Sequence, residues 1–254
     1  MKKLIIVLTL IALMITLVAC NNKKNNDNGE TPTSTPTENK SDKTKTISAE
    51  EAEQLVAKAN KYLQDNPYFI CNIELDSTAT GISVKQKMTN EISGKNAKSD
   101  SNLGDSAKLV QTIVDGVYYA SSESTGNAKI KRAISEADAK SEIENMFSQV
   151  TLVISYMKEI TNDYTLITGD DGSQTLYISL TQTEDNEEAS LTIYINFDKD
   201  GRYTSVSYES ASSNTTTEET TKVSCQSLFE YKDSSFKISA PADASEYIDS
   251  TSRR

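Results

Sequence analysis

Histidine and tryptophan are both absent from this chain of 254 residues. Histidine is the side chain that most often serves as a general base near neutral pH and as a ligand for transition metals. Its absence also removes the usual activator of a cysteine thiolate, so an enzyme would have to use carboxylate, Lys, Tyr, Ser or unassisted Cys chemistry. From these absences we expect no enzymatic activity, no catalytic residues, no metal and no other cofactor.

Apolar side chains are scarce, since hydrophobic residues make up 36% of the chain, which is low for a uniformly packed globule. Part of the dilution comes from NNKKNNDNGETPTSTPTENKSDKTKT, from Asn21 to Thr46, which has no large apolar side chain. Such a segment cannot bury enough surface to offset its ordering entropy, so we expect residues 20–46 to form a disordered tether. We expect residues 47–248 to form a single domain, followed by a tail of residues 249–254.

Basic residues are outnumbered by acidic ones, 26 against 37, which gives a formal charge of −11. Without Lys2 and Lys3, which precede the first apolar segment, the balance is 24 against 37, or −13. An acidic protein repels phosphates, which argues against nucleic acid as a partner and against lying flat on an anionic bilayer. Attachment to a membrane should therefore be covalent.

The first twenty residues have the layout of a secretory signal. Lys2 and Lys3 precede sixteen mostly apolar residues, whereas a membrane span usually needs about 20. The ending Leu-Val-Ala-Cys resembles the lipobox of bacterial lipoproteins, in which the cysteine is acylated and the signal is cleaved before it. We therefore predict a signal peptide over residues 1–19 and a lipidated Cys20. The alternative is an uncleaved span that ends in an accidental cysteine.

A lipidated Cys20 would hold the protein on the cell membrane at its extracytoplasmic face. Each buried methylene of an acyl chain, such as palmitate, contributes about 0.8 kcal/mol, and two or more chains anchor a protein stably. In this interpretation the membrane is a partner through the lipid anchor, and the polar segment after Cys20 is the tether.

The folded region begins with a helix and continues with strands. Ser48 and Glu51 have the spacing of a capping box, and Asn66-Pro67 ends the helix. From Tyr68 onward apolar residues alternate with polar ones, as in antiparallel strands with one exposed face. Glycines recur every ten to thirteen residues, as hairpin turns would, at Gly81, Gly94, Gly104, Gly116 and Gly126.

A second helix is predicted from Glu136 to Ile160, and alternation resumes after it. The order is helix, about six strands, helix and about five strands. This order predicts an α+β fold with a strongly curved antiparallel sheet, an unclosed barrel, whose concave face is covered by helices. Seven tyrosines lie in predicted strands, where we expect them to pack across neighbouring strands: Tyr118, Tyr119, Tyr177, Tyr194, Tyr203, Tyr208 and Tyr231.

The second helix carries a wide apolar stripe, which we predict to contact an apolar ligand if the protein binds one. The alternative is that the stripe fills the concave face as ordinary core. The residues predicted to line the ligand are Met146, Phe147, Val150, Val153, Ile154 and Met157.

Cys71 and Cys225 both fall on the apolar face of a predicted strand. Outside the membrane they could form a disulfide, and the alternative is two buried thiols that act as small hydrophobic groups. Early and late strands of an unclosed barrel need not be neighbours, which weakens the case for a disulfide.

Two Asp-Gly segments have partial calcium-loop spacing. Asn196, Asp198 and Asp200 precede Gly201, and Asp170-Asp171-Gly172 is a poorer version. A complete loop needs a bidentate Glu about six residues after the glycine, and those positions are Ser207 and Ile178. Hairpin turns are therefore the better interpretation, and no metal site is predicted.

The apparent lipobox and tether, the order of elements, the NFDKDGRYTSVSYE hairpin and the ending FKISAPADASEYI together resemble the lipoprotein-carrier superfamily of LolA, LolB, LppX and LprG. The chain also looks like uncharacterised relatives of that superfamily among surface lipoproteins of Gram-positive bacteria. The resemblance implies an unclosed barrel with a helical lid that holds acyl chains or lipid-modified partners. It implies no catalytic residue, because no short functional motif is shared.

Two main hypotheses about function follow, and a third, a hydrolase, has the least support. The first is a membrane-anchored surface lipoprotein whose partner is a lipid, another hydrophobic ligand or a lipidated protein. The second is an interaction or structural module of the cell envelope with a filled core and no ligand. The carrier-like order of elements favours the first.

Overall fold

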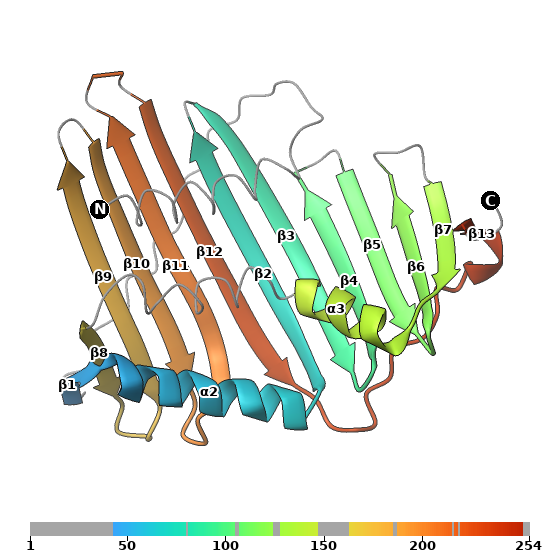
Figure 1. Ribbon diagram of the computed structural model, residues 1–254, viewed down its shortest axis with the longest axis horizontal. Coiled ribbons are helices and arrows are strands. Elements are labelled where there is room, and N and C mark those ends of the chain that lie inside the picture. Colours follow the sequence, from blue (N-terminus) through green and yellow to red (C-terminus); the bar gives the residue numbers. More distant parts are fainter. Residues whose placement is uncertain are drawn as a thin grey trace. The chain divides into compact units, whose positions relative to one another are not determined.

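The computed structural model describes residues 43–79, 81–104, 107–123, 128–146, 163–184, 187–214, 216–217 and 219–250. Within these residues the elements are as follows (Figure 1): β1 Lys43–Ser48, α2 Ala49–Asp65, β2 Tyr68–Ala79, β3 Ile82–Ser93, β4 Asn96–Leu103, β5 Ala107–Val114, β6 Val117–Ser122, β7 Ala128–Ala133, α3 Glu136–Met146, β8 Asp163–Thr168, β9 Gln174–Glu184, β10 Glu187–Phe197, β11 Tyr203–Asn214, β12 Glu219–Tyr231, a 3-10 helix Ala244–Glu246 and β13 Ile248–Asp249.

The thirteen strands form one antiparallel sheet in the order β1-β8-β9-β10-β11-β12-β2-β3-β4-β5-β6-β7-β13. The short β13 is the exception, because it pairs with β7 in parallel. β1 and β13 are the two ends of this order, so the sheet is not closed. The predicted α+β class with an unclosed antiparallel sheet is confirmed at this level.

The chain divides into two compact units, and the expected single domain over residues 47–248 stays a prediction. The first contains the described residues of Met1–Ala59, Asp76–Val84 and Tyr156–Cys225, and the second those of Asn60–Leu75, Lys85–Ser155 and Gln226–Arg254. Neither unit is continuous in sequence, since the chain passes between them several times.

The first unit is built on alternation along β9, β10 and β11. Ile193 faces Ile178 on one side and Tyr208 on the other, and all three side chains are buried. Ile195 faces Leu176 and Val206 in the next buried row. Because successive residues of a strand point to opposite faces, every intervening side chain lies on the other face of the sheet. The unit therefore has one apolar and one polar face.

Helix α2 begins at the predicted capping box. The Glu51 N–H donates to the Ser48 hydroxyl at 3.2 Å, and the Ser48 N–H donates to the Glu51 carboxylate at 3.0 Å. In the first unit the helix buries Ala52, Val56 and Ala59, and the Tyr203 hydroxyl donates to the Val56 carbonyl at 3.2 Å. The helix thus covers the apolar face of the first unit.

In the second unit, the core includes buried residues of β2 to β6 and of the carboxyl-terminal segment. The rings of Phe69 and Phe229 are 6.2 Å apart, and the Lys232 N–H donates to the Tyr68 carbonyl at 2.8 Å. The chain after β12 packs on the same unit, because Ile238 is buried and Tyr247 packs edge-on against Tyr119 at 5.4 Å. The carboxyl-terminal segment is therefore part of the fold.

The structure corrects the predicted boundary of the tether. β1 starts at Lys43, inside the segment expected to be disordered, and Thr44 and Thr46 face Ile167 and Thr165 of β8. A polar strand can form here because its backbone pairs with β8, a partner more than 100 residues away. The turns at Gly81, Gly94, Gly104 and Gly116 are as predicted, each with positive φ, while Gly126 lies outside the described residues.

Replacing Ile193 by Ala should lower the free energy of unfolding by about 2–5 kcal/mol, because its fully buried side chain would leave a cavity between two neighbours. The matched control is Ile82→Ala, because Ile82 is 70% exposed and its loss should change stability by no more than about 0.5 kcal/mol. Urea-induced unfolding measures both. Equal effects of the two substitutions would contradict the proposed core.

Candidate functional site

One face of strands β3 to β7 in the second unit carries helix α3 (Figure 1). The Asn90 side-chain amide on β3 donates to the Met146 carbonyl at 2.9 Å, and Arg132 on β7 pairs with Glu142 at 3.2 Å. At its start the helix is capped by Ser135, whose hydroxyl accepts from the Asp138 N–H at 3.1 Å. We call this side of the sheet the α3 face.

Polar side chains occupy the α3 face where apolar ones would be expected. The pairing places Asn90 opposite Ser99 and Ser99 opposite Gln111, so these three residues form a row across three strands. Asn90 and Ser99 are buried. Beside this row, the Gln86 side-chain amide donates to the Ser101 hydroxyl at 3.0 Å. Within it, the Gln111 side-chain amide donates to the Tyr118 hydroxyl at 2.6 Å. We call Asn90, Ser99 and Gln111 the polar row.

The carbonyl oxygen of Asn90 has no hydrogen-bond donor among the described residues, although the side chain is 0% exposed. The orientation of the amide is set by the Met146 carbonyl, which can only accept, so the nitrogen of Asn90 must face it. A buried acceptor without a donor costs about 1–3 kcal/mol. An O–H or N–H group of a ligand would remove that cost.

Exposed apolar side chains lie on the same face as the polar row. Leu109 is 40% exposed and lies opposite Ser101 and Ser122, while Ile130 is 42% exposed and lies opposite Ala120. Ile248 of β13 is paired with Ile130 and is also exposed. The α3 face therefore combines a buried polar row with an accessible apolar edge, an arrangement suited to an amphipathic ligand.

Polar contacts link helix α3 to this face. None of the residues in the described Glu136–Met146 is buried. Besides the contacts of Asn90 and Arg132, Lys95 pairs with Glu136 at 2.6 Å, and both of these side chains are more than three-quarters exposed. Exposed ion pairs contribute about 0–1 kcal/mol each, so the Lys95–Glu136 pair adds little to the attachment of this helix.

The structure describes one of the six predicted ligand-lining residues. Met146 is the last residue of α3, half-buried, and its carbonyl accepts from Asn90. Phe147, Val150, Val153, Ile154 and Met157 lie outside the described residues, and so does Cys20. The start of the second helix at Glu136 is as predicted, and its continuation to Ile160 lies outside the described residues.

Cys71 and Cys225 are both buried as thiols, on β2 and β12. Burial raises the pKa of the Tyr208 hydroxyl, and Cys225 contributes to the rise through the charge of its ionised form and a hydrogen bond. The proposed disulfide stays a prediction for the oxidised protein.

The two Asp-Gly segments form hairpin turns, as predicted. The Asp198 carboxylate accepts from the N–H groups of Asp200 and Arg202, both at 2.9 Å, and from the Arg202 guanidinium at 2.5 Å. Asp171 accepts from the Ser173 N–H at 2.9 Å. Both carboxylates are thus used within their own turns. The part of the chain that the structure describes contains no cluster of three or more Cys, Asp or Glu side chains that could hold a metal ion.

Sequence reasoning missed the polar row, although a signal was present. In ISVKQKMTNEIS the apolar residues Ile82, Val84, Met88 and Ile92 recur at even spacing and so share one face of β3. Gln86 and Asn90 interrupt that same set at even spacing, so they must lie on the buried face. A polar residue at a core position of a strand is the signal that would have found the site.

No known protein family matches the chain, and no curated protein matches its sequence. Among the residues that the structure describes, no helix has the length and apolar content needed to cross a membrane.

Stability should depend on the ionisation of Asp198. Burial opposes ionisation of this carboxyl group, but hydrogen bonds from Arg202 and Asp200 outweigh the burial and lower its pKa. A group whose pKa is lower in the folded state stabilises the fold above its unfolded pKa, about 3.9 for Asp, and loses that contribution as pH falls through the folded pKa.

Wild-type protein should therefore be more stable than Asp198→Asn at pH 7, and the difference should shrink as the pH falls below about 4. Chemical denaturation of both proteins across this pH range measures the difference. A difference that stays constant or grows on acidification would show that the carboxylate does not stabilise the turn.

Proposed function

We propose that this protein is a lipid-anchored bacterial surface lipoprotein that binds an amphipathic ligand, either a lipid or a lipid-modified partner, on its α3 face. The observation that carries the ligand proposal is the buried side-chain oxygen of Asn90, which has no donor among the described residues and lies on the same face of the sheet as exposed apolar side chains. The anchor proposal rests on the sequence that ends at Cys20. No catalytic step is part of the proposal.

In this proposal the polar part of the ligand donates a hydrogen bond to the Asn90 oxygen, and Ser99 and Gln111 supply further polar groups in the same row. The apolar part lies against Leu109, Ile130 and Ile248, whose exposed surface would then leave water. Because α3 buries none of its residues, the ligand can enter between helix and sheet without breaking a packed core.

The proposal includes a relationship to the lipoprotein-carrier superfamily and the finer architecture that the resemblance implies. In that architecture the sheet is strongly curved, and helices cover its concave face. The predicted apolar stripe that begins at Met146 would then contribute to the ligand site. What supports the relationship is the order of helix, six strands, helix and five strands, which the structure reproduces between α2 and β12.

The ligand proposal is tested with the chain that starts at Asn21, which lacks Cys20 and its acyl groups. Native mass spectrometry should detect a lipid adduct, and a fluorescent fatty acid should bind saturably. Leu109→Asp should weaken the binding of the fatty acid at least about tenfold, because a carboxylate would replace an apolar contact. Leu109 is exposed, so the substitution should leave folding intact.

The matched control is Leu228→Asp on β12, because Leu228 is 47% exposed and is not part of the defined α3 face. Its affinity for the fatty acid should equal that of the wild type. Absence of any bound lipid, or equal losses in the two variants, would reject the α3 face as the ligand site and favour a cell-envelope module with a filled core.

The anchor is tested separately by Cys20→Ser in the full-length chain. The substitution removes the thiol that would form the thioether to the lipid, so metabolic labelling with palmitate should disappear. The protein should also leave the membrane fraction or remain as an unprocessed precursor. Labelling that persists in Cys20→Ser would place the acyl groups elsewhere and contradict the anchor.

A further inference from the structure

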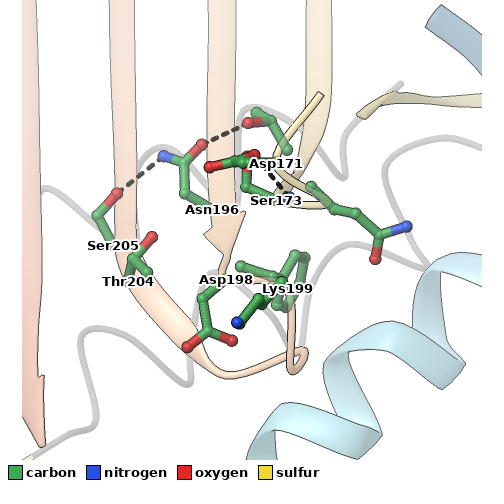
Figure 2. Close-up of a pocket in the computed structure, with 10 residues that line it drawn as sticks. Asp171, Ser173, Asn196, Asp198, Lys199, Thr204 and Ser205 are labelled. Carbon is green, nitrogen blue, oxygen red and sulfur yellow. Dashed lines mark hydrogen bonds between the residues drawn. The ribbon is translucent and has the colours of Figure 1, made fainter. Parts of the chain in front are cut away.

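A second candidate site lies in the first unit, on the polar face of strands β9 to β11. A cleft of about 580 Å³ lies where these strands meet the β8–β9 and β10–β11 turns (Figure 2). Its volume is within the range of small-molecule sites, roughly 300–1,000 Å³. All the residues that line it except Phe197 are polar, which distinguishes it from the apolar sites that bind lipids.

The floor of the cleft is a fixed row of hydrogen-bonding groups. Asn196 lies between Thr175 and Ser205: the Thr175 hydroxyl donates to its carbonyl oxygen at 2.6 Å, and its amide nitrogen donates to the Ser205 hydroxyl at 2.8 Å (Figure 2). These bonds orient the amide and leave it a second N–H, while the Ser205 hydroxyl retains its own proton to donate. The row therefore presents donors at set spacings.

A β-bulge brings a further hydroxyl to the cleft. Asn196 pairs with Ser205 and Phe197 with Tyr203, so Thr204 is an extra residue of β11 without a partner in the pairing. Thr204 is exposed and lines the cleft beside Ser205 (Figure 2). Bulges of this kind re-aim side chains beside functional sites.

Two tyrosine rings continue the same face. Tyr177 of β9 pairs with Tyr194 of β10. Each lies two residues from a member of the hydrogen-bonding row, Thr175 or Asn196, so both rings point to the same side of the sheet as that row, about 7 Å further along the strands. Their ring centroids are 5.0 Å apart, and both side chains are half-buried. A sugar ring has an apolar face of C–H groups and a rim of hydroxyls, which match an aromatic surface next to amide and hydroxyl groups.

The charged groups around the cleft give it no positive excess, because Asp171 and Asp198 are matched by Lys199 and by Arg202, which pairs with Asp198. Asp171 and Asp198 both line it, and hydrogen bonds within their turns lower the pKa of each carboxyl group, so both are ionised at neutral pH. Burial raises the pKa of the nearby Tyr194 hydroxyl, assisted by Tyr177 and Glu209, so this hydroxyl keeps its proton. Lys199 is the one cationic residue among those lining the cleft. These charges offer no net attraction to a phosphate or uronate, whereas a neutral polyol needs none.

We propose that the cleft and the adjoining Tyr177–Tyr194 pair bind a neutral glycan chain. One sugar unit hydrogen-bonds to the row of Thr175, Asn196 and Ser205, and the next lies against the tyrosine rings. This site is separate from the α3 face and takes a different class of ligand, so either can fail without the other.

The test uses the chain that starts at Asn21 and isothermal titration with cellopentaose, maltopentaose and chitopentaose, with heparin as the anionic comparison. At least one neutral oligosaccharide should bind saturably, and heparin should not bind. Asn196→Ala and Tyr194→Thr should each weaken that binding at least about tenfold, since one removes the central amide and the other a ring.

Tyr194→Phe and Thr181→Ala serve as controls with little risk to folding. The first keeps the ring, and the second removes an exposed hydroxyl near the far end of β9, so both should bind within about twofold of the wild type. Thermal unfolding of each variant shows whether its fold is retained. Binding of heparin alone, no binding of any neutral oligosaccharide, or wild-type affinity in folded Asn196→Ala would overturn the proposal.

Discussion

The fold depends on the pairing register of β9, β10 and β11, because the period of a strand is two residues. A slip of β10 by one residue would turn Ile193, with every other buried side chain of β10, to the face opposite Ile178 and Tyr208. The same register sets Asn196 between Thr175 and Ser205, and Tyr194 beside Tyr177. The pairing register therefore determines both which side chains form the buried core and which lie on the polar face, including those that line the cleft.

Polar residues break the expected alternation in the second unit. On the α3 face, Asn90 and Ser99 occupy positions that β3 and β4 would otherwise fill with apolar side chains. Asn90 donates to Met146 but leaves its oxygen without a donor among the described residues, a cost that packing alone does not explain. Proteins tend to place polar residues at core positions, and buried groups without partners, at their functional sites. For this reason we treat the α3 face as a candidate site.

Much of the architecture was predictable because its signals are local. The Ser48–Glu51 capping box, the start of a helix at Glu136 and the glycines of the β-turns act within a few residues of chain, and the structure reproduces them. The candidate sites were harder to predict. Asn90 was visible as a polar residue at a core position, whereas the row of Thr175, Asn196 and Ser205 required the pairing of three strands.

The sequence by itself determined the alternation of the strands, the helix caps, the acidic charge and the apolar segment that precedes Cys20, because each depends on neighbouring residues or on composition. Only the tertiary structure decided that Lys43–Ser48 is a strand, since its polar side chains give no apolar pattern and its partner β8 lies more than 100 residues away. It also decided the division into two units and the neighbours of Asn90 and Asn196. Those contacts join segments that are distant in the sequence. Which distant strands pair with one another depends on the packing of the whole sheet, so local sequence patterns do not determine it.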